Sequence, residues 1–334
     1  MTNEKSAFST DVLRLDCAAE TERIVQTLRA SVLGDFKRKG GVVGISGGID
    51  SSVVAALGMR AFGKDRMLAL TMPERDSGLE TMPLCRLLVD ALGVATLHQD
   101  ITAVLEATGC YARRDAAIRE VIPEYGPGWK SKIVLPDVLT GDLVRFFSVV
   151  ASSPTGDTVK VRLPAAAYLA VVAATNFKQR VRTMTEYHHA DRLNYAVLGT
   201  PNRLEYDQGF FVKGGDGLAD VKPIAHLYKT QVYAMAEYLG VPAEIRGRPP
   251  TTDTYSMPQS QEEFYFSLPF GSMDLCLWAR SHGVSATQAA PTLGLSPKQV
   301  ERVYRDIDAK RRVARYLHAG LVLIEDAAPT PAGR

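Results

Sequence analysis

Short apolar runs alternate with amphipathic segments through the first hundred residues. Three runs of four or five residues have the length of buried strands, and around them apolar residues recur at helical spacing. We expect strands at 42–45, 67–71 and 94–98 and helices at 10–39, 53–62 and 84–92. This order predicts right-handed βαβ units and a parallel sheet flanked by helices. Such a Rossmann-like α/β fold binds ligands at the carboxyl ends of its strands.

The alternation stops between residues 107 and 163. Segments rich in β-branched and aromatic residues at 146–150 and 159–163 flank the turn sequence 154–157, which predicts a hairpin. We interpret 107–163 as a β-containing insertion within a single domain that spans 1–334. Two interpretations of its role stay open: a lid or substrate wall, and a surface decoration without chemistry.

Helical periodicity returns in the second half of the chain. We expect helices at 164–190 and 228–239, a strand at 195–200 and a helical C-terminal extension at 256–325. The clearest helix of the extension follows Ser296, which suits an N-cap, with Pro297 at the first helical position and Gln299 at the third. The residues from Asp326 onwards are rich in Ala and Pro and are expected to fray.

Two helices around Gly294 have the spacing of a helix-turn-helix. The second is basic, with Arg302, Arg305, Lys310, Arg311 and Arg312. Three acidic residues interrupt this basic set, and 39 Lys and Arg against 37 Asp and Glu leave a net charge of only +2. We therefore expect a structural helical hairpin and no nucleic-acid partner.

Composition is typical of a globular cytoplasmic protein, with 46% hydrophobic and 23% charged residues among 334. No apolar run approaches the roughly 18 residues that a membrane helix needs, and the N-terminus lacks the pattern of a signal peptide. The four cysteines, Cys17, Cys85, Cys110 and Cys276, lie far apart without a CxxC pair. We expect buried thiols in a reducing cytoplasm and no membrane partner.

The stretch GGVVGISGGIDSS at 40–52 is the strongest candidate for chemistry. An apolar strand leads into a glycine turn and then a helix, so backbone N–H groups and a helix N-terminus point at one spot, as in anion sites. Hydroxyl groups and the carboxylate of Asp50 suit a phosphate with its Mg²⁺. The expected phosphate-binding residues are Gly44, Ile45, Ser46, Gly47, Gly48, Ile49 and Ser51.

The sequence of this loop can also be compared with the motifs of other protein classes. The P-loop pattern GxxxxGK[ST] is absent, but Gly44 to Gly48 satisfies G-x-S-x-G, the nucleophile elbow of Ser hydrolases. A hydrolase would use Ser46 with a later Asp and with His282 or His318. A purely structural turn is a further alternative. The longer string SGGIDSS is more specific, and it resembles the pyrophosphate-binding loop of the N-type ATP pyrophosphatases.

A second block narrows this resemblance. Residues 176–182 (NFKQRVR) and 197–233 (VLGTPNRLEYDQGFFVKGGDGLADVKPIAHLYKTQVY) are similar to ammonia-dependent NAD synthetases, which share these motifs in this order. The resemblance implies an adenine nucleotide alpha-hydrolase-like fold. It also implies that ATP adenylates the carboxylate of deamido-NAD with release of pyrophosphate, after which ammonia displaces AMP to give NAD.

The resemblance also implies roles for individual residues. Asp50 and Glu205 would hold Mg²⁺, and Lys229 would sit on a phosphate. The implied ATP contacts are Thr200, Lys229 and Thr251, and the implied contacts to deamido-NAD are Arg182, Lys213, Asp220 and Lys310. Arg180 and Arg182 lie two apart and cannot share a helix face, so one of them is expected to be a solvated charge.

Three departures from the family pattern bear on the substrate. Ala309 stands where an aromatic residue or His usually precedes the tail Lys, Gly214 stands at a usual Tyr, and the insertion is long. The same adenylation and amidation of another carboxylic acid is therefore the alternative. With 40 residues before the first strand, we expect no glutaminase domain, so ammonia is free or comes from a separate glutaminase. The resemblance also implies a homodimer.

Overall fold

The computed structural model describes residues 8–135, 138–139, 146–251, 254–266 and 268–324. Its centre is a parallel sheet in the order β3-β2-β1-β7. The strands are β1 Gly41–Gly44, β2 Met67–Thr71, β3 Ala95–His98 and β7 Ala196–Val197. The three strands expected in the first hundred residues are confirmed to within one residue. The strand expected at 195–200 is shorter, because the chain bridges to Val221 at Leu198.

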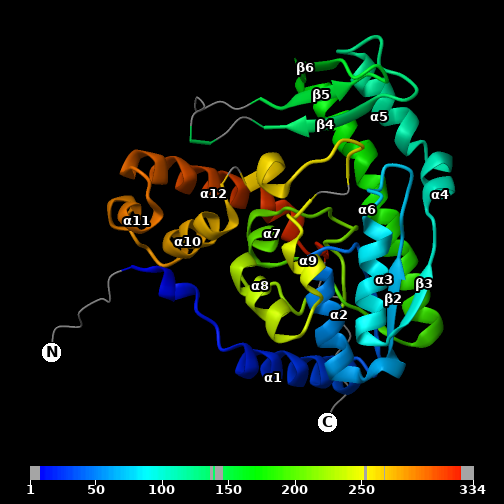
Figure 1. Cartoon of the computed structure of the whole chain (residues 1–334), viewed down its shortest axis with the longest axis vertical. Helices are drawn as coiled ribbons and strands as arrows, with labels where there is room; N and C mark the ends of the chain where they lie inside the picture. The colour runs from blue at the N-terminus through cyan, green and yellow to red at the C-terminus, as the bar shows by residue number, and fades with distance from the viewer. Residues whose placement is uncertain (1–7, 136–137, 140–145, 252–253, 267, 325–334) are drawn as a thin grey trace.

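Neighbouring residues of the central strands face opposite layers of helices. Val43 packs in a core with α1 (Cys17–Leu28), α2 (Ile49–Phe62), α3 (Thr81–Leu92) and α8 (Lys229–Tyr238). Val42 packs on the other face with α4 (Thr102–Ala107), α5 (Cys110–Arg119) and α6 (Ala165–Leu193). Helices cover both faces of the sheet (Figure 1), which confirms the predicted fold class. The inner strands β1 and β2 are accordingly buried and mostly apolar, whereas the edge strand β3 is exposed.

The single helix expected at 10–39 is wrong in detail. The segment divides into a 3₁₀ turn at Thr10–Leu13, helix α1, and a π-helical stretch at Arg29–Asp35. The division at α1 has a local cause, because the side chain of Asp16 accepts the N–H groups of Ala18 and Ala19 at 3.1 and 3.0 Å. This N-cap starts a new helix where apolar spacing alone indicated continuity.

The insertion carries a separate antiparallel sheet in the order β4-β5-β6. Strands β5 Ser148–Ser152 and β6 Thr158–Arg162 form the expected hairpin, and β4 Lys130–Val134 is a third strand that the pattern did not predict. Helices α4 and α5, which precede this sheet, pack on α6 and on the central strands. Figure 1 shows the three strands beyond one end of α6, away from the central sheet.

The second half of the chain is mostly helical, as expected. Helix α6 ends at Asn194, and α7 Arg203–Gln208, α8 and α9 Ala243–Gly247 follow β7. The C-terminal extension contains a π-helical turn at Glu262–Phe266 and α10 Phe270–Ser281, α11 Ala286–Leu293 and α12 Pro297–His318. Ser296 accepts the Gln299 N–H and Gln299 accepts the Ser296 N–H, which confirms the predicted capping box. The tail from Asp326, expected to fray, lies outside the described residues.

The expectation of a structural hairpin at 285–312 agrees with the packing of α10, α11 and α12 around one core. Arg311 pairs with Asp207 of α7 at 2.6 Å, and Arg280 pairs with Asp308 at 2.7 Å. The basic side chain of Arg311 therefore contacts an acidic residue of the same chain.

All four cysteines are free thiols, as expected. Cys85, Cys110 and Cys276 are buried and Cys17 is half-buried. Burial raises the pKa of the Cys276 thiol to about 12. Among the described residues, none of the helices combines the length and the apolar character that a membrane span requires.

Candidate active site

The loop after β1 has the geometry of an anion site. Ile45 continues β1 by donating its N–H to the Leu70 carbonyl at 2.8 Å, and α2 begins at Ile49. Gly47 has φ +72°, and a Cβ there would lie 2.9 Å from Cβ of Leu84, so both conformation and space favour glycine. The Ser51 and Ser52 hydroxyls donate to the Gly48 carbonyl at 3.1 and 2.8 Å, which fixes the turn at the helix N-terminus.

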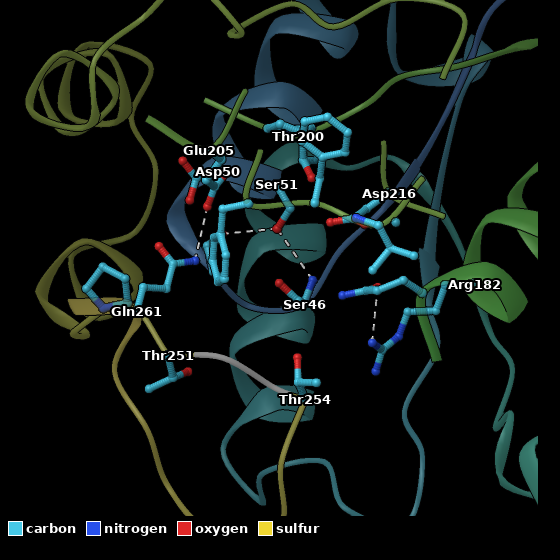
Figure 2. Close-up of a pocket in the computed structure, with 18 of the residues that line it drawn as sticks. Ser46, Asp50, Ser51, Arg182, Thr200, Glu205, Asp216, Thr251, Thr254 and Gln261 are labelled. Carbon is cyan, nitrogen blue, oxygen red and sulfur yellow. Dashed lines mark hydrogen bonds between the residues drawn. The ribbon is translucent and has the colours of Figure 1, made fainter. Parts of the chain in front are cut away.

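Two carboxylates converge on one buried ammonium beside this loop. The Lys229 ammonium donates to Oδ2 of Asp50, and the Asn202 amide donates to Oδ1 of Asp50 at 2.9 Å. Glu205 accepts the Asn202 N–H at 3.1 Å through Oε2 and the Gln261 amide at 3.1 Å through Oε1. Figure 2 shows Asp50 and Glu205 side by side, on the opposite side of the loop from Arg182.

The charges in this cluster do not balance. Burial would lower the pKa of Lys229, but the carboxylates of Asp50 and Glu205 outweigh it and raise that pKa. Burial, with the nearby Asp50 carboxylate, raises the pKa of Glu205 to about 8. Two carboxyl groups thus share one ammonium, an arrangement that favours an additional cation. Within the described part of the chain, no three His, Cys, Asp or Glu side chains are grouped to hold a metal by themselves.

A cavity of about 370 Å³ opens at the carboxyl ends of β1, β2 and β7. One wall is a polar face of α6, lined by Thr175, Asn176, Gln179, Arg182, Thr183 and Glu186. Another part of the lining is aromatic and consists of Phe210, Phe211, Phe264 and Tyr265. Phe147 of the insertion also lines the cavity, so the insertion contributes to the cavity wall, and its role in binding stays a prediction.

A second acidic pair lies on the α6 side of the cavity. Burial, with Asp216 nearby, raises the pKa of Glu186 to about 8, and burial raises the pKa of Asp216 to about 6. Asp216 also closes a turn by accepting the Val212 N–H at 2.8 Å. Sequence reasoning missed Glu186 as a pocket residue. Its position four residues after Arg182 places both on one helix face, a signal that could have identified it.

Several predicted site residues do line the cavity. They are the loop residues Gly44 to Ser51 together with Arg182, Thr200, Glu205 and Thr251. Lys229 lies behind the loop and reaches it through Asp50. Arg180 is exposed on a different face of α6 from Arg182, as the two-residue spacing predicted.

Three residues that were predicted to contact the acid substrate form hydrogen bonds with other groups of the chain. Asp220 accepts the Val197 N–H at 2.8 Å, beside the central sheet. Lys213 donates to the carbonyls of Tyr316 and Ala319 at 2.8 and 3.0 Å, at the end of α12. Lys310 donates to the Tyr265 carbonyl at 2.5 Å and pairs with Asp306. None of these three lines the cavity in the described structure, and their substrate roles stay predictions.

The histidines required by the hydrolase alternative lie elsewhere. His282 stacks on Trp278 with ring centroids 3.8 Å apart, and His318 bonds the Tyr206 carbonyl at 2.8 Å. Among the described residues that line the cavity with Ser46 there is no His. The chain therefore brings no imidazole to Ser46, and the nucleophile-elbow match has no triad around it.

Comparison of the sequence with those of known proteins points to a single family. A sequence profile of the NAD synthase family matches residues 20–121 and 154–314. The NH(3)-dependent NAD(+) synthetase of Mesorhizobium japonicum is 59% identical over 308 residues, which is 92% of this chain and 97% of that protein. The protein of the same name from Rhizobium meliloti is 57% identical over 318 residues, or 95% of each chain.

Solved structures agree on the fold. NMN synthetase from Francisella tularensis superposes with a TM-score of 0.64 at 22% identity, covering 94% of this chain and all of that one. NH3-dependent NAD synthetase from Campylobacter jejuni gives a TM-score of 0.61 at 20% identity, covering 93% and 100%. The family match skips residues 122–153, which hold all of β4 and β5. The loop, the paired carboxylates, the profile match and the full-length relatives together show that this chain belongs to the NAD synthase family.

Proposed function

We propose that this chain is an ATP-dependent amide ligase that makes NAD from deamido-NAD and ammonia. The carboxylate of deamido-NAD attacks the α-phosphorus of ATP and releases pyrophosphate, and ammonia then displaces AMP from the acyl-adenylate. The observation that carries the proposal is the loop Gly44–Ser51 at a helix N-terminus, with Asp50 and Lys229 beside it. Relatives named NH(3)-dependent NAD(+) synthetase, 57–59% identical over nearly the full chain, support ammonia as nitrogen donor.

Each part of the site has a task in this reaction. Backbone N–H groups of the loop and the start of α2 would bind the leaving pyrophosphate, where negative charge develops. Lys229, fixed by Asp50, would place a positive charge against the same phosphates. Arg182 on the α6 wall would meet the acid substrate. The apolar side with Phe210 and Phe264 would exclude water that competes with ammonia for the adenylate.

The residues present fit a magnesium ion. Asp50 and Glu205 are two carboxylates that share one ammonium, and Mg²⁺ is usually bound by one or two carboxylates plus substrate phosphates and water. When bound, Mg²⁺ would neutralise charge on the phosphates of ATP. Asn202 orients both carboxylates, since its side chain contacts Asp50 and its N–H contacts Glu205.

The other carboxylic acid suggested by the three departures is not favoured, because close relatives that span nearly the full chain carry the NAD synthetase name. We further propose a cytoplasmic homodimer that uses free ammonia or ammonia from a separate glutaminase.

The test is a product assay on the purified chain. With ATP, deamido-NAD, ammonium and Mg²⁺, we expect equal amounts of NAD, AMP and pyrophosphate. Glutamine in place of ammonium should give little turnover. Formation of ADP would contradict adenylation, and cleavage of an ester without ATP that only Ser46→Ala abolishes would support a hydrolase instead. Turnover of another acid in preference to deamido-NAD would correct the substrate and leave the chemistry standing.

A further inference from the structure

Lys178 is a completely buried lysine outside the cavity. It lies on α6, and its ammonium donates three hydrogen bonds: to Oε1 of Glu74 at 2.8 Å, to Oδ2 of Asp76 at 2.8 Å and to the Thr254 carbonyl at 2.9 Å. An ammonium has three N–H groups, so each has an acceptor. The three acceptors come from two segments far apart in sequence, residues 73–78 and residues 254–255.

Two residues of α5, within the insertion, bond to the same two carboxylates. Arg114 of α5 also donates to Oδ2 of Asp76 at 2.5 Å, and the Tyr111 hydroxyl of α5 donates to Oε2 of Glu74 at 2.7 Å. Burial acts to raise the pKa of Asp76, but Lys178 and Arg114 outweigh it and hold that pKa below its ordinary value. The charges balance, with Lys178 and Arg114 facing Glu74 and Asp76.

The two segments that Lys178 holds both form the rim of the cavity. Pro73 and Ser77 line it from the segment that follows β2, beside the phosphate loop. Thr254 lines it from the other segment, and in Figure 2 its side chain points toward Ser46. Neither segment is a helix or strand of its own, so bonds from outside determine where it lies.

We propose that Lys178 is a positioning residue that locks both rim segments onto α6 and thereby shapes the ATP half of the cavity. This inference rests on the proposed function only in taking ATP as the ligand of the loop. Lys178 does not line the cavity, and its three N–H groups are all bonded, so it acts through the segments it holds. The insertion, through α5, stiffens this arrangement and contributes to ATP binding without touching ATP.

The matched variants are Lys178→Met, which keeps the volume and removes the charge, and Lys178→Arg, which keeps the charge. The control is Lys160→Met on β6 of the insertion, because Lys160 is exposed. Lys178→Met leaves Glu74 and Asp76 underpaired, and that loss can unfold the chain. The triple variant Glu74→Gln, Asp76→Asn, Lys178→Met removes the lock while Arg114 keeps its ion pair with Asp115 at 2.8 Å, and circular dichroism checks that the variant is folded.

Two measurements then test the proposal. Equilibrium binding of ATP with Mg²⁺ should weaken about tenfold or more in Lys178→Met or the triple variant, because a rim that is no longer preorganised must be ordered by the ligand. Lys178→Arg should recover part of the loss, and Lys160→Met should bind like wild type. Hydrogen exchange of amides in 73–78 and 254–256 should be faster in the folded variants, whereas exchange in α2 should be unchanged.

Catalysis separates positioning from general damage. We expect the KM for ATP to rise at least tenfold, and the KM for deamido-NAD and kcat to change less than threefold. Equal losses in all three constants, or unchanged ATP affinity in a folded variant, would overturn the proposal. Because ATP binding and hydrogen exchange need no acid substrate, failure of wild type to use deamido-NAD would refute the proposed function without deciding this inference.

Discussion

Two lysines in the described part of the chain, Lys178 and Lys229, are completely buried, and their surroundings differ in one respect. Lys178 faces Glu74 and Asp76, and Arg114 completes a set of two positive and two negative charges. Lys229 pairs with Asp50 and has Glu205 nearby, so two carboxyl groups share one ammonium. The pKa of Asp76 is held below its ordinary value, whereas that of Glu205 is raised to about 8.

We propose that this difference separates a structural site from a binding site. A buried network with matched charges is complete in the folded chain and needs nothing further. A buried cluster with excess carboxylate is stabilised when a cation arrives, and it opens on the cavity through Asp50 and Glu205. Burial of a lysine alone therefore does not identify an active site; the balance of charges around it does.

The largest effect is expected at the unbalanced cluster. Asp50→Asn keeps the shape and removes one negative charge, so it should lower kcat for AMP formation a hundredfold or more, on the order of other losses of electrostatic contacts. The unfolding midpoint should fall by only a few degrees, since Asp50 lies at the cavity. Asp65→Asn, an exposed change, is the control. Full activity in Asp50→Asn would show that the unbalanced cluster is structural after all.

A smaller effect is expected on the α6 wall. Arg182→Ala should raise the KM for deamido-NAD more than tenfold and leave the KM for ATP nearly unchanged, because a lost charge-assisted hydrogen bond to the acid costs about 1.5–3 kcal/mol in ground and transition state alike. Arg180→Ala is the matched control, since Arg180 is exposed two residues away. An equal change in both KM values would place Arg182 outside the acid site.

Lys310 gives a related contrast, because its ammonium already bonds the Tyr265 carbonyl behind the cavity wall. If deamido-NAD meets Lys310 directly, Lys310→Ala should raise its KM more than tenfold, as for Arg182→Ala. If Lys310→Ala instead lowers thermal stability and changes the KM values for ATP and deamido-NAD alike, the role of Lys310 is to hold Tyr265 in place. Steady-state kinetics and thermal unfolding of the same preparation distinguish the two results.

Local sequence was enough to predict the central sheet and the phosphate loop. The inner strands at 42–45 and 67–71 are mostly apolar because both faces of the sheet are covered there, and glycine at 47 follows from a positive φ and close packing. The capping box at Ser296 is likewise a pattern of neighbouring residues. These features depend on residues within a few positions of one another, and periodicity or motif spacing records them.

Contacts between distant segments could not be predicted in this way. The partners of Lys178 are about a hundred residues before it and 76 after it, and β4 reaches its partner β5 across a segment that lies partly outside the described residues. The balance of charges around Lys178 and Lys229 depends on which carboxylates the fold brings together. Sequence alone placed Lys178 and Lys229 in two different motifs of the family, and only the three-dimensional arrangement separates their roles.

The acidic pair on the α6 side of the cavity, Glu186 and Asp216, offers a test through pH. Because the pKa of Glu186 is raised to about 8 from an ordinary 4.5, the folded chain holds a proton there that the unfolded chain releases. The free energy of unfolding should therefore fall as pH rises from about 4.5 to 8. Glu186→Gln cannot ionise, so it should match wild type at pH 4 and exceed its stability by about 4 kcal/mol at pH 8.

Urea unfolding of both proteins at several pH values measures this difference. The contribution from Glu205 is common to both proteins and cancels in it, whereas Asp216 interacts with Glu186 and its titration is part of the measured difference. If the difference in the free energy of unfolding between the two proteins does not depend on pH, Glu186 is ionised at neutral pH. Nearby positive charge would then be sufficient to stabilise its carboxylate.

The smallest effect is expected inside the balanced network. Tyr111→Phe removes the hydroxyl that donates to Glu74 at 2.7 Å but leaves Lys178 paired with Glu74. Stability should fall by about 1.5 kcal/mol, the low end for a hydrogen bond to a charged group. The KM for ATP should change less than threefold, because all three bonds of Lys178 remain. Tyr238→Phe, at a half-exposed ring, is the control. A large rise in the KM for ATP would mean that the insertion, more than Lys178, sets the shape of the rim.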